Sequence, residues 1–365
     1  MKILAIETSC DETSIALLEA KGGLRSPQFR VIENYVSSQI KVHRPFGGVV
    51  PNLAKREHLK NLPLILKKME KKIDLKKDVD ALAVTIGPGL EPALWTGIAF
   101  AKNLAKEWKK PLLAVNHLKG HLYSFLLECP SSPCRLSPVS KLFPAVALIV
   151  SGGHTILLKM DSLTKFKKLG ETRDDAAGEA FDKIARLLNL PYPGGPEIEK
   201  AGRRGDPSAV NFPRPMLNAK NYDFSFAGLK TAVFYYLKQN KFLPAGVKKI
   251  SNFRLNEPKN NLPLKRFVDN VAASFEQAAI DVLVKKTIRA VQNNKAKNVF
   301  LSGGVAANKK LRKTFKKELD KINCGFIAPS RGFNTDNAAI IAVAAYISHL
   351  QKEKKRIYAR ANISL

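Results

Sequence analysis

The sequence has no long hydrophobic run. Apolar residues make up 45% of the 365 residues, yet no stretch of about 20 consecutive apolar residues occurs. Residues 1–6 enter a strand-like pattern, with no signal or transit pattern before it. The chain therefore reads as globular, and we expect it in the cytoplasm.

Cysteine is scarce as well. Cys10, Cys129, Cys134 and Cys324 are too scattered for a disulfide framework, and no CxxC pair occurs. Cys129 and Cys134 bracket a Pro/Ser-rich loop, but zinc would need two further ligands nearby, which the local sequence lacks. We expect all four cysteines to be reduced and mostly structural.

Acidic residues are few compared with basic ones. The chain has 61 Lys and Arg but only 31 Asp and Glu, a formal net charge of +30. Clustered cations release counterions from a phosphate backbone on binding, so RNA is a natural partner. A lysine-rich composition that only solvates the surface explains the charge equally well.

Apolar segments alternate between strand and helix patterns. The opening run ILAIETSCDETSIALLEA reads as two antiparallel strands, joined by a turn at Ser9 to Glu12 that displays Asp11. Further patterns predict strands and helices in turn. The strands are expected at 79–86, 112–115, 145–160 (two strands and a turn) and 298–301, and the helices at 52–72, 92–108 and 305–319.

This pattern predicts an α/β fold with two lobes and a duplicated core. Each half has a polar turn between strands, so both turns could face a shared nucleotide cleft. The lobe boundaries follow from a Pro/Ser-rich stretch in the middle of the chain. We expect a first lobe at 1–128, a connecting loop at 129–144, a second lobe with helical insertions at 145–350, a basic loop within it at 238–265, and a basic tail at 351–365.

Two histidines could share a metal. His117 and His121 lie four residues apart, so a helix would set both imidazoles on one face, although such a pair is often only structural. Leu118 stands where a thermolysin-like protease needs a glutamate, which argues against proteolysis. Asp336 precedes an apolar helix and could be an N-cap or the third ligand of an open metal site.

Glycine-rich turns and acidic residues mark a possible nucleotide site. Ser151-Gly152-Gly153-His154 and Ser302-Gly303-Gly304 each follow an apolar strand, where phosphate or adenosine contacts occur in duplicated ATPase folds. His154 could also be a core or turn residue. Asp182 belongs to an acidic helix that is either solvated or able to bind hydroxyls, and residues 192–196 form a rigid turn.

Taken together, these motifs resemble those of the tRNA threonylcarbamoyltransferase family (TsaD), once classed as O-sialoglycoprotein endopeptidases, in its bacterial and organellar branch. The resemblance covers nearly the whole chain. It rests on Ile6 to Thr13, His43 to Pro51, Gly87 to Leu90, Val115 to His121, Val150 to Thr155, Asp174 to Lys183, Phe224 to Lys230, Leu301 to Asn308 and Thr335 to Ala339.

The resemblance implies an actin, sugar-kinase and chaperone-ATPase fold and a metal-assisted acyl transfer. The donor would be threonylcarbamoyl-AMP, and the acceptor N6 of the adenosine next to the anticodon in tRNAs that read codons beginning with A. One divalent metal ion per subunit, iron or zinc, is implied. So are a paralogous TsaB-type partner and a small TsaE-type ATPase.

The resemblance also implies roles for individual residues. His117, His121 and Asp336 match the metal ligands, and Asp11 matches the catalytically required aspartate of the turn. The substrate and nucleotide contacts are matched by Ile149, Val150, Ser151, Gly152, Gly153, Asp182, Gly195 and Asn308.

Two positions depart from the family pattern. Lys119 stands where the family commonly has glutamate in HxEGH, which predicts either a weaker metal site or a side chain that faces outward. Asn334 replaces a common cysteine. Two other functions stay open: a small-molecule kinase of the same fold would leave the two histidines idle, and a non-catalytic RNA-binding scaffold would explain only the charge.

Overall fold

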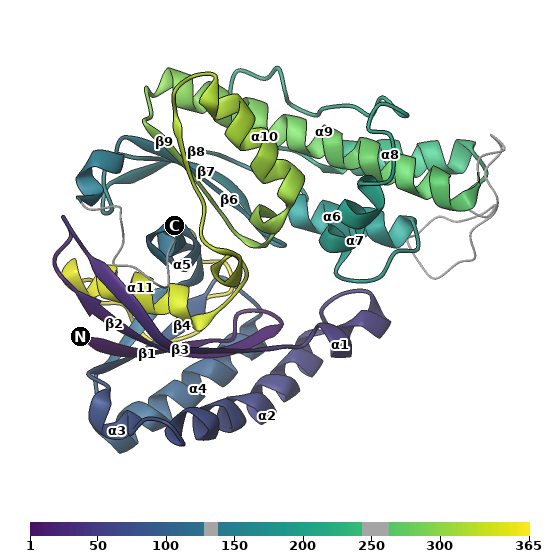
Figure 1. Ribbon diagram of the computed structural model, residues 1–365. Coiled ribbons are helices and arrows are strands. Elements are labelled where there is room, and N and C mark those ends of the chain that lie inside the picture. Colours follow the sequence, from purple (N-terminus) through teal and green to yellow (C-terminus); the bar gives the residue numbers. More distant parts are fainter. Residues whose placement is uncertain (128–137, 243–262) are drawn as a thin grey trace.

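The computed structural model describes residues 1–127, 138–242 and 263–365, and in these ranges it contains two five-stranded sheets (Figure 1). The first has the order β3-β2-β1-β4-β5 and the second, read from its other edge, β8-β7-β6-β9-β10. In both, the central strand pairs antiparallel with the next strand of the chain and parallel with a later one. The expected duplicated α/β core is confirmed.

Most of the strands predicted from the sequence are present at the expected positions. The first sheet contains β1 Lys2–Glu7, β2 Glu12–Lys21, β3 Gln28–Ser38, β4 Ala81–Gly87 and β5 Leu112–Asn116. The second contains β6 Ala145–Val150, β7 Thr155–Met160, β8 Phe166–Glu171, β9 Asn298–Ser302 and β10 Gly325–Ile327. The inner strands β4 and β6 are buried along their whole length, as apolar runs in such positions require.

The sequence analysis did not predict β3, β8 or β10. The edge strands β3 and β8 carry charged residues such as Arg30, Glu33 and Lys168, so they lack a clean apolar alternation. Both edge strands also contain a bulge: β3 has the extra residue Ile32 opposite Leu17 and Leu18, and β8 has Leu169 opposite Leu157 and Leu158. Each bulge interrupts the period of two from which a strand is predicted.

Helices cover the outer faces of both sheets (Figure 1). The first lobe contains α1 Ile40–His43, α2 Pro51–Glu70, α3 Leu75–Asp78, α4 Glu91–Trp108 and α5 His117–Tyr123. The later helices are α6 Ala177–Leu187, α7 Gly194–Gly202, α8 Ala227–Gln239, α9 Leu264–Asn293, α10 Lys309–Asp320 and α11 Ala338–Leu350. In the ranges that the structure describes, none of these helices is both long and apolar enough to cross a membrane.

Helix α11 differs in position from what the sequence suggested. It lies in the segment expected to belong to the second lobe, yet it packs against β1, β2 and β5 of the first sheet and against α5 (Figure 1). It is apolar all round, and such a helix is stable only when it is enclosed on every side. Its residues share one core cluster with strands of both sheets, so α11 joins the lobes.

Parts of two expected loops fall outside the described residues. The connecting loop at 129–144 is described only from residue 138, and the basic loop at 238–265 only at its two ends. Cys129 and Cys134 also lie outside the described residues.

Candidate active site and metal centre

The two histidines project from the first turn of α5 and the turn after it. Asn116 ends β5 and caps this helix, because its Oδ1 accepts from the amides of Leu118 (2.8 Å) and Lys119 (3.3 Å). The cap starts the helix at His117, so His121 follows one turn later on the same face. The rings meet edge to face, with centroids 4.7 Å apart, and both side chains are buried.

Asp336 meets these two histidines from the start of α11. Its Oδ1 lies 3.0 Å from Nε2 of His121 and 3.5 Å from Nε2 of His117. Sequence alone left open that Asp336 caps the helix, but Asn337 is the cap, accepting from the amides of Ala339 and Ile340. The carboxylate of Asp336 is therefore available to a ligand.

The geometry of this group suits a metal ion. One ligand atom from each of His117, His121 and Asp336 lies within 4.8 Å of the others. Ligands about 2.0–2.1 Å from a tetrahedral ion are roughly 3.3 Å apart, close to the 3.0 and 3.5 Å found here. Two imidazoles and one carboxylate leave further coordination positions open, so the three residues form a possible metal site.

Glu7 contacts the ring nitrogen of His117 that faces away from Asp336. The sequence analysis did not identify this residue. It is fully buried, and its Oε2 lies 3.2 Å from Nδ1 of His117 and accepts from the Thr85 hydroxyl at 2.5 Å. A carboxylate on the second nitrogen of a ligating histidine fixes the ring and its tautomer. The available signal was a glutamate at the end of an otherwise apolar strand.

The buried carboxylates and imidazoles shift one another's pKa values. Burial by itself lowers the pKa of His117, but Asp336 and Glu7 outweigh it and raise that pKa to about 9. For Asp336 the burial would raise the pKa, yet the positive charge of His117 holds it well below its usual range. A cation that binds here therefore displaces a proton from His117.

Lys119 faces away from the metal site. Its Nζ donates to Oε1 of Glu353 at 2.5 Å, in the segment after α11, and this contact settles the choice left open by the sequence. The two side chains are only 10% and 25% exposed, so the pair is largely withdrawn from water. Because Glu353 offsets the positive charge of Lys119, this side chain repels a bound metal ion only weakly.

Removing this charge is expected to affect stability more than metal binding. In Lys119→Met the free energy of unfolding should fall by about 1–3 kcal/mol, because Glu353 loses the closer of its two lysine partners in a partly buried site and keeps only Lys355, at 3.3 Å. Metal affinity should change by less than about threefold. Denaturation and metal titration measure the two effects, with the double variant Lys119→Met/Glu353→Gln as control. A metal affinity that changes tenfold or more would contradict the outward orientation.

Asp11 lies in the turn between β1 and β2 and faces the second lobe. It is 8% exposed, and its Oδ2 accepts from the hydroxyl of Tyr192 at 3.4 Å. The carbonyl of Tyr192 in turn accepts from Nε of Arg44 at 2.9 Å. Side chains of both lobes therefore meet at this end of the cleft.

The two glycine-rich turns lie side by side at the ends of β6 and β9. A Cβ on Gly303, which has a φ of 94°, would collide with the carbonyl of Val150, so only glycine allows this approach. Beyond Gly152 and Gly153, no atom lies within 4 Å of where a Cβ would be. A ligand could therefore reach the backbone of the Ser151–Gly153 turn, whereas Ile149 and Val150 are buried in the sheet.

The other expected contact residues belong to helices of the second lobe: Asp182 to α6, Gly195 to the start of α7, and Asn308 to the start of α10. Asp182 lies on α6, where its Oδ1 accepts from the amide of Gly194 at 2.7 Å. Burial, followed by the nearby charge of Asp11, raises the pKa of Asp182 to about 6. The side chain of Asn308 caps α10 and donates to Glu276 at 2.7 Å, so it also has a structural role.

Gly178 is a further residue of this site that the sequence analysis did not single out. It opens α6, and a Cβ there would lie 2.6 Å from the carbonyl oxygen of Ser151 and 2.9 Å from the backbone of Gly152. Replacing Gly178 with alanine is therefore expected to displace the turn and weaken nucleotide binding at least tenfold. Calorimetry with AMP measures this, and Gly23→Ala, which also has open space and lies outside the proposed nucleotide site, is the control. Equal affinities for the two variants would contradict it.

Comparison with known proteins places this chain in a family. The sequence model of tRNA N6-adenosine threonylcarbamoyltransferase (TsaD) matches residues 30–343. The chain is 44% identical to the protein of that name from Thermosipho africanus, covering 95% of this chain and 94% of the relative. For Fervidobacterium nodosum the identity is 45%, over 94% and 92% of the two chains.

Solved structures agree on the fold. HypF from T. kodakarensis matches 96% of this chain and 48% of its own, with a TM-score of 0.53 and 14% identity. A full-length HypF in a phosphate- and nucleotide-bound form matches with a TM-score of 0.54 at 12% identity, over 98% and 56% of the two chains. These likenesses show that the chain shares its two-lobed α/β fold with HypF. From the sequence matches, which run almost from end to end, the chain belongs to the tRNA N6-adenosine threonylcarbamoyltransferase family.

Proposed function

We propose that this protein transfers the threonylcarbamoyl group of threonylcarbamoyl-AMP to N6 of the adenosine next to the anticodon, in tRNAs that read codons beginning with A. The observation that carries the proposal is the meeting of His117, His121 and Asp336 in a chain of this family. A small-molecule kinase would have no use for that group, and an RNA-binding scaffold would need neither it nor the glycine-rich turns.

The donor would lie against the second lobe. The open backbone of Ser151, Gly152 and Gly153 suits a phosphate, because amide groups in such a turn form an anion-binding concavity. Asp182 and the start of α7 at Gly195 would bind the ribose hydroxyls. Ile149, Val150 and Asn308 would support this surface by fixing the strand and the helix on either side.

His117, His121 and Asp336 would hold one divalent ion, iron or zinc. When bound, it supplies a Lewis acid that polarises the carbamoyl or phosphate oxygens. Glu7 would keep His117 oriented through Nδ1, at the 3.2 Å separation described above.

The chemistry at the acceptor needs a group that takes a proton. The N6 amine attacks the carbamoyl carbon, an N–C bond forms, and the bond from that carbon to the phosphate oxygen breaks. AMP leaves with the electron pair. Asp11 would accept the proton that N6 loses, with Tyr192 holding the carboxylate across the cleft.

Neutralising Asp182 is expected to stabilise the protein while weakening donor binding. The pKa of Asp182, about 6, lies above its ordinary 3.8, so the folded state binds this proton more tightly than the unfolded state. The folded state therefore loses stability as pH rises from about 4 to 6. Above pH 6, Asp182→Asn should raise the free energy of unfolding by up to about 3 kcal/mol. Denaturation at pH 4 and 7.5 measures it, with exposed Asp320→Asn as control; a gain that does not grow with pH would contradict it.

tRNA would be the macromolecular partner, and the charge of +30 favours its phosphate backbone. We further propose a TsaB-type paralogue and a TsaE-type small ATPase as protein partners, on the family resemblance alone, and the cytoplasm as the site of action.

Mass spectrometry of anticodon-loop nucleosides tests the function. The purified protein, loaded with iron or zinc and mixed with its TsaB-type and TsaE-type partners, is given threonylcarbamoyl-AMP and tRNA. Threonylcarbamoyl-adenosine should appear at the position next to the anticodon. Absence of this nucleoside under every metal condition would reject the proposal, and a phosphorylated product from labelled ATP and small sugars would favour the kinase instead.

A further inference from the structure

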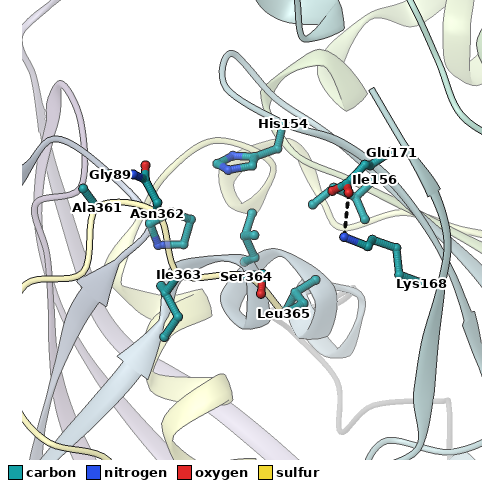
Figure 2. Close-up of a pocket in the computed structure, with 12 residues that line it drawn as sticks. Gly89, His154, Ile156, Lys168, Glu171, Ala361, Asn362, Ile363, Ser364 and Leu365 are labelled. Atoms are coloured by element: carbon teal, nitrogen blue, oxygen red, sulfur yellow. Dashed lines mark hydrogen bonds and ion pairs between the residues drawn. The ribbon is translucent and has the colours of Figure 1, made fainter. Parts of the chain in front are cut away.

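A cavity of about 410 Å³ lies between the lobes, next to the metal centre (Figure 2). Gly89 borders it from the first lobe and Leu118 from α5. His154 and Ile156 of the second lobe form the opposite wall, and Figure 2 shows the imidazole pointing toward the opposing chain segment. That segment is residues 361–365, which line the remaining side.

Residues 361–365 form a fixed wall. The amide of Arg360 donates to the carbonyl of Ile86 at 2.7 Å, and the amide of Gly89 donates to the carbonyl of Ala361 at 3.2 Å. Further along, Nδ2 of Asn116 donates to the carbonyl of Ser364 at 3.0 Å. Asn116 is the residue that caps α5, so one side chain fixes both the start of the metal-site helix and this wall.

The cavity is separate from the surface proposed for the donor. None of the donor residues named above lines it. The two regions meet at the turn after β6, where Ser151 to Gly153 belong to the donor side and His154 to the cavity. The cavity also reaches Leu118, the neighbour of His117. An acyl transfer between two substrates needs two binding regions that meet at the reacting group, and this cavity occupies the second position.

We propose that this cavity receives the acceptor nucleoside of the tRNA, with residues 361–365 as a positioning wall. The inference rests on the proposed function. The volume lies within the range of pockets that enclose small molecules, and apolar side chains with a few polar groups are the usual lining for an aromatic base. Lys168 lines the cavity, is about half exposed and pairs with Glu171 at 2.7 Å, so it would be the cation that contacts a flanking phosphate.

Filling the cavity tests this assignment. Asn362 lines the cavity and is exposed, so Asn362→Trp adds bulk there while the buried core stays unchanged. The KM for tRNA should rise at least tenfold, and binding of a labelled anticodon stem-loop should weaken by the same factor. Metal content and the affinity for a stable threonylcarbamoyl-AMP analogue should stay within twofold. Asn103→Trp, which adds the same bulk at an exposed position of α4 that does not line the cavity, should resemble the unsubstituted protein in every measurement.

Two results would overturn the inference. One is unchanged stem-loop affinity and KM in Asn362→Trp. The other is a parallel loss of affinity for the donor analogue, which would assign the cavity to the donor. If the unsubstituted protein modifies no tRNA, the proposed function fails, whereas the stem-loop binding comparison still decides whether the cavity holds the acceptor.

Discussion

Replacing Asp336 with asparagine is expected to lower the rate of threonylcarbamoyl transfer at least about 100-fold and to reduce the bound metal in proportion. The substitution keeps the shape of the side chain but removes the charge that faces both histidines at 3.0 and 3.5 Å. Loss of a partner behind a ligand already costs about 10–100-fold, so loss of a ligand should cost more. Transfer kinetics and elemental analysis of the purified variant measure the two effects.

The same substitution at a remote position provides the control. Asp320 is exposed at the end of α10, and Asp320→Asn should retain full activity and metal content. His121→Ala should behave like Asp336→Asn, because His121 shares the same carboxylate oxygen. If either metal-site variant kept full activity after chelation, the proposed metal centre would be rejected.

Asp11→Asn is expected to lower kcat by about 100- to 10,000-fold, the range for loss of a positioned acid or base. Metal content should not change, because Asp11 is outside the metal group, and donor affinity should change far less than kcat, because no hydrogen bond joins Asp11 to the Ser151–Gly153 turn in the described residues. The asparagine still accepts from Tyr192 but cannot take the proton from N6. Single-turnover transfer, measured next to equilibrium binding of the donor analogue, separates chemistry from binding.

Tyr192→Phe is the matched comparison for Asp11. It removes only a long hydrogen bond of 3.4 Å and leaves the carboxylate in place, so kcat should fall less than about tenfold. A loss larger than that of Asp11→Asn would contradict the role of Asp11, since it would make Tyr192 the more important group.

Sequence patterns predicted only part of the group formed by His117, His121 and Asp336. Spacing indicated that His117 and His121 share a helix face, but it could not decide between a structural pair and ligands. For Asp336 the local pattern favoured a helix cap over a ligand, and only the resemblance over the whole chain favoured the ligand. The structure gives the physical reason: Asn337 caps α11, so the preceding carboxylate turns toward the histidines.

What the sequence did not predict depends on contacts between distant segments. The role of Glu7 depends on its contact with His117. The outward orientation of Lys119 depends on its ion pair with Glu353, 234 residues later in the chain. Gly178 is restricted by the backbone of Ser151 and Gly152. Local periodicity contains no information on such pairs, because each partner fits its own helix or strand equally well without the other.

The position of α11 sets an order of events during synthesis. Asp336 is 215 residues later in the chain than His121, and the helix it precedes packs against strands made at the very beginning. While the ribosome is still translating the second sheet, the nascent chain has both imidazoles but no third ligand. With the proposed ligands, a metal ion would find its complete site only after α11 has emerged and inserted between the sheets, so a chain with bound metal would be one whose two halves have already docked.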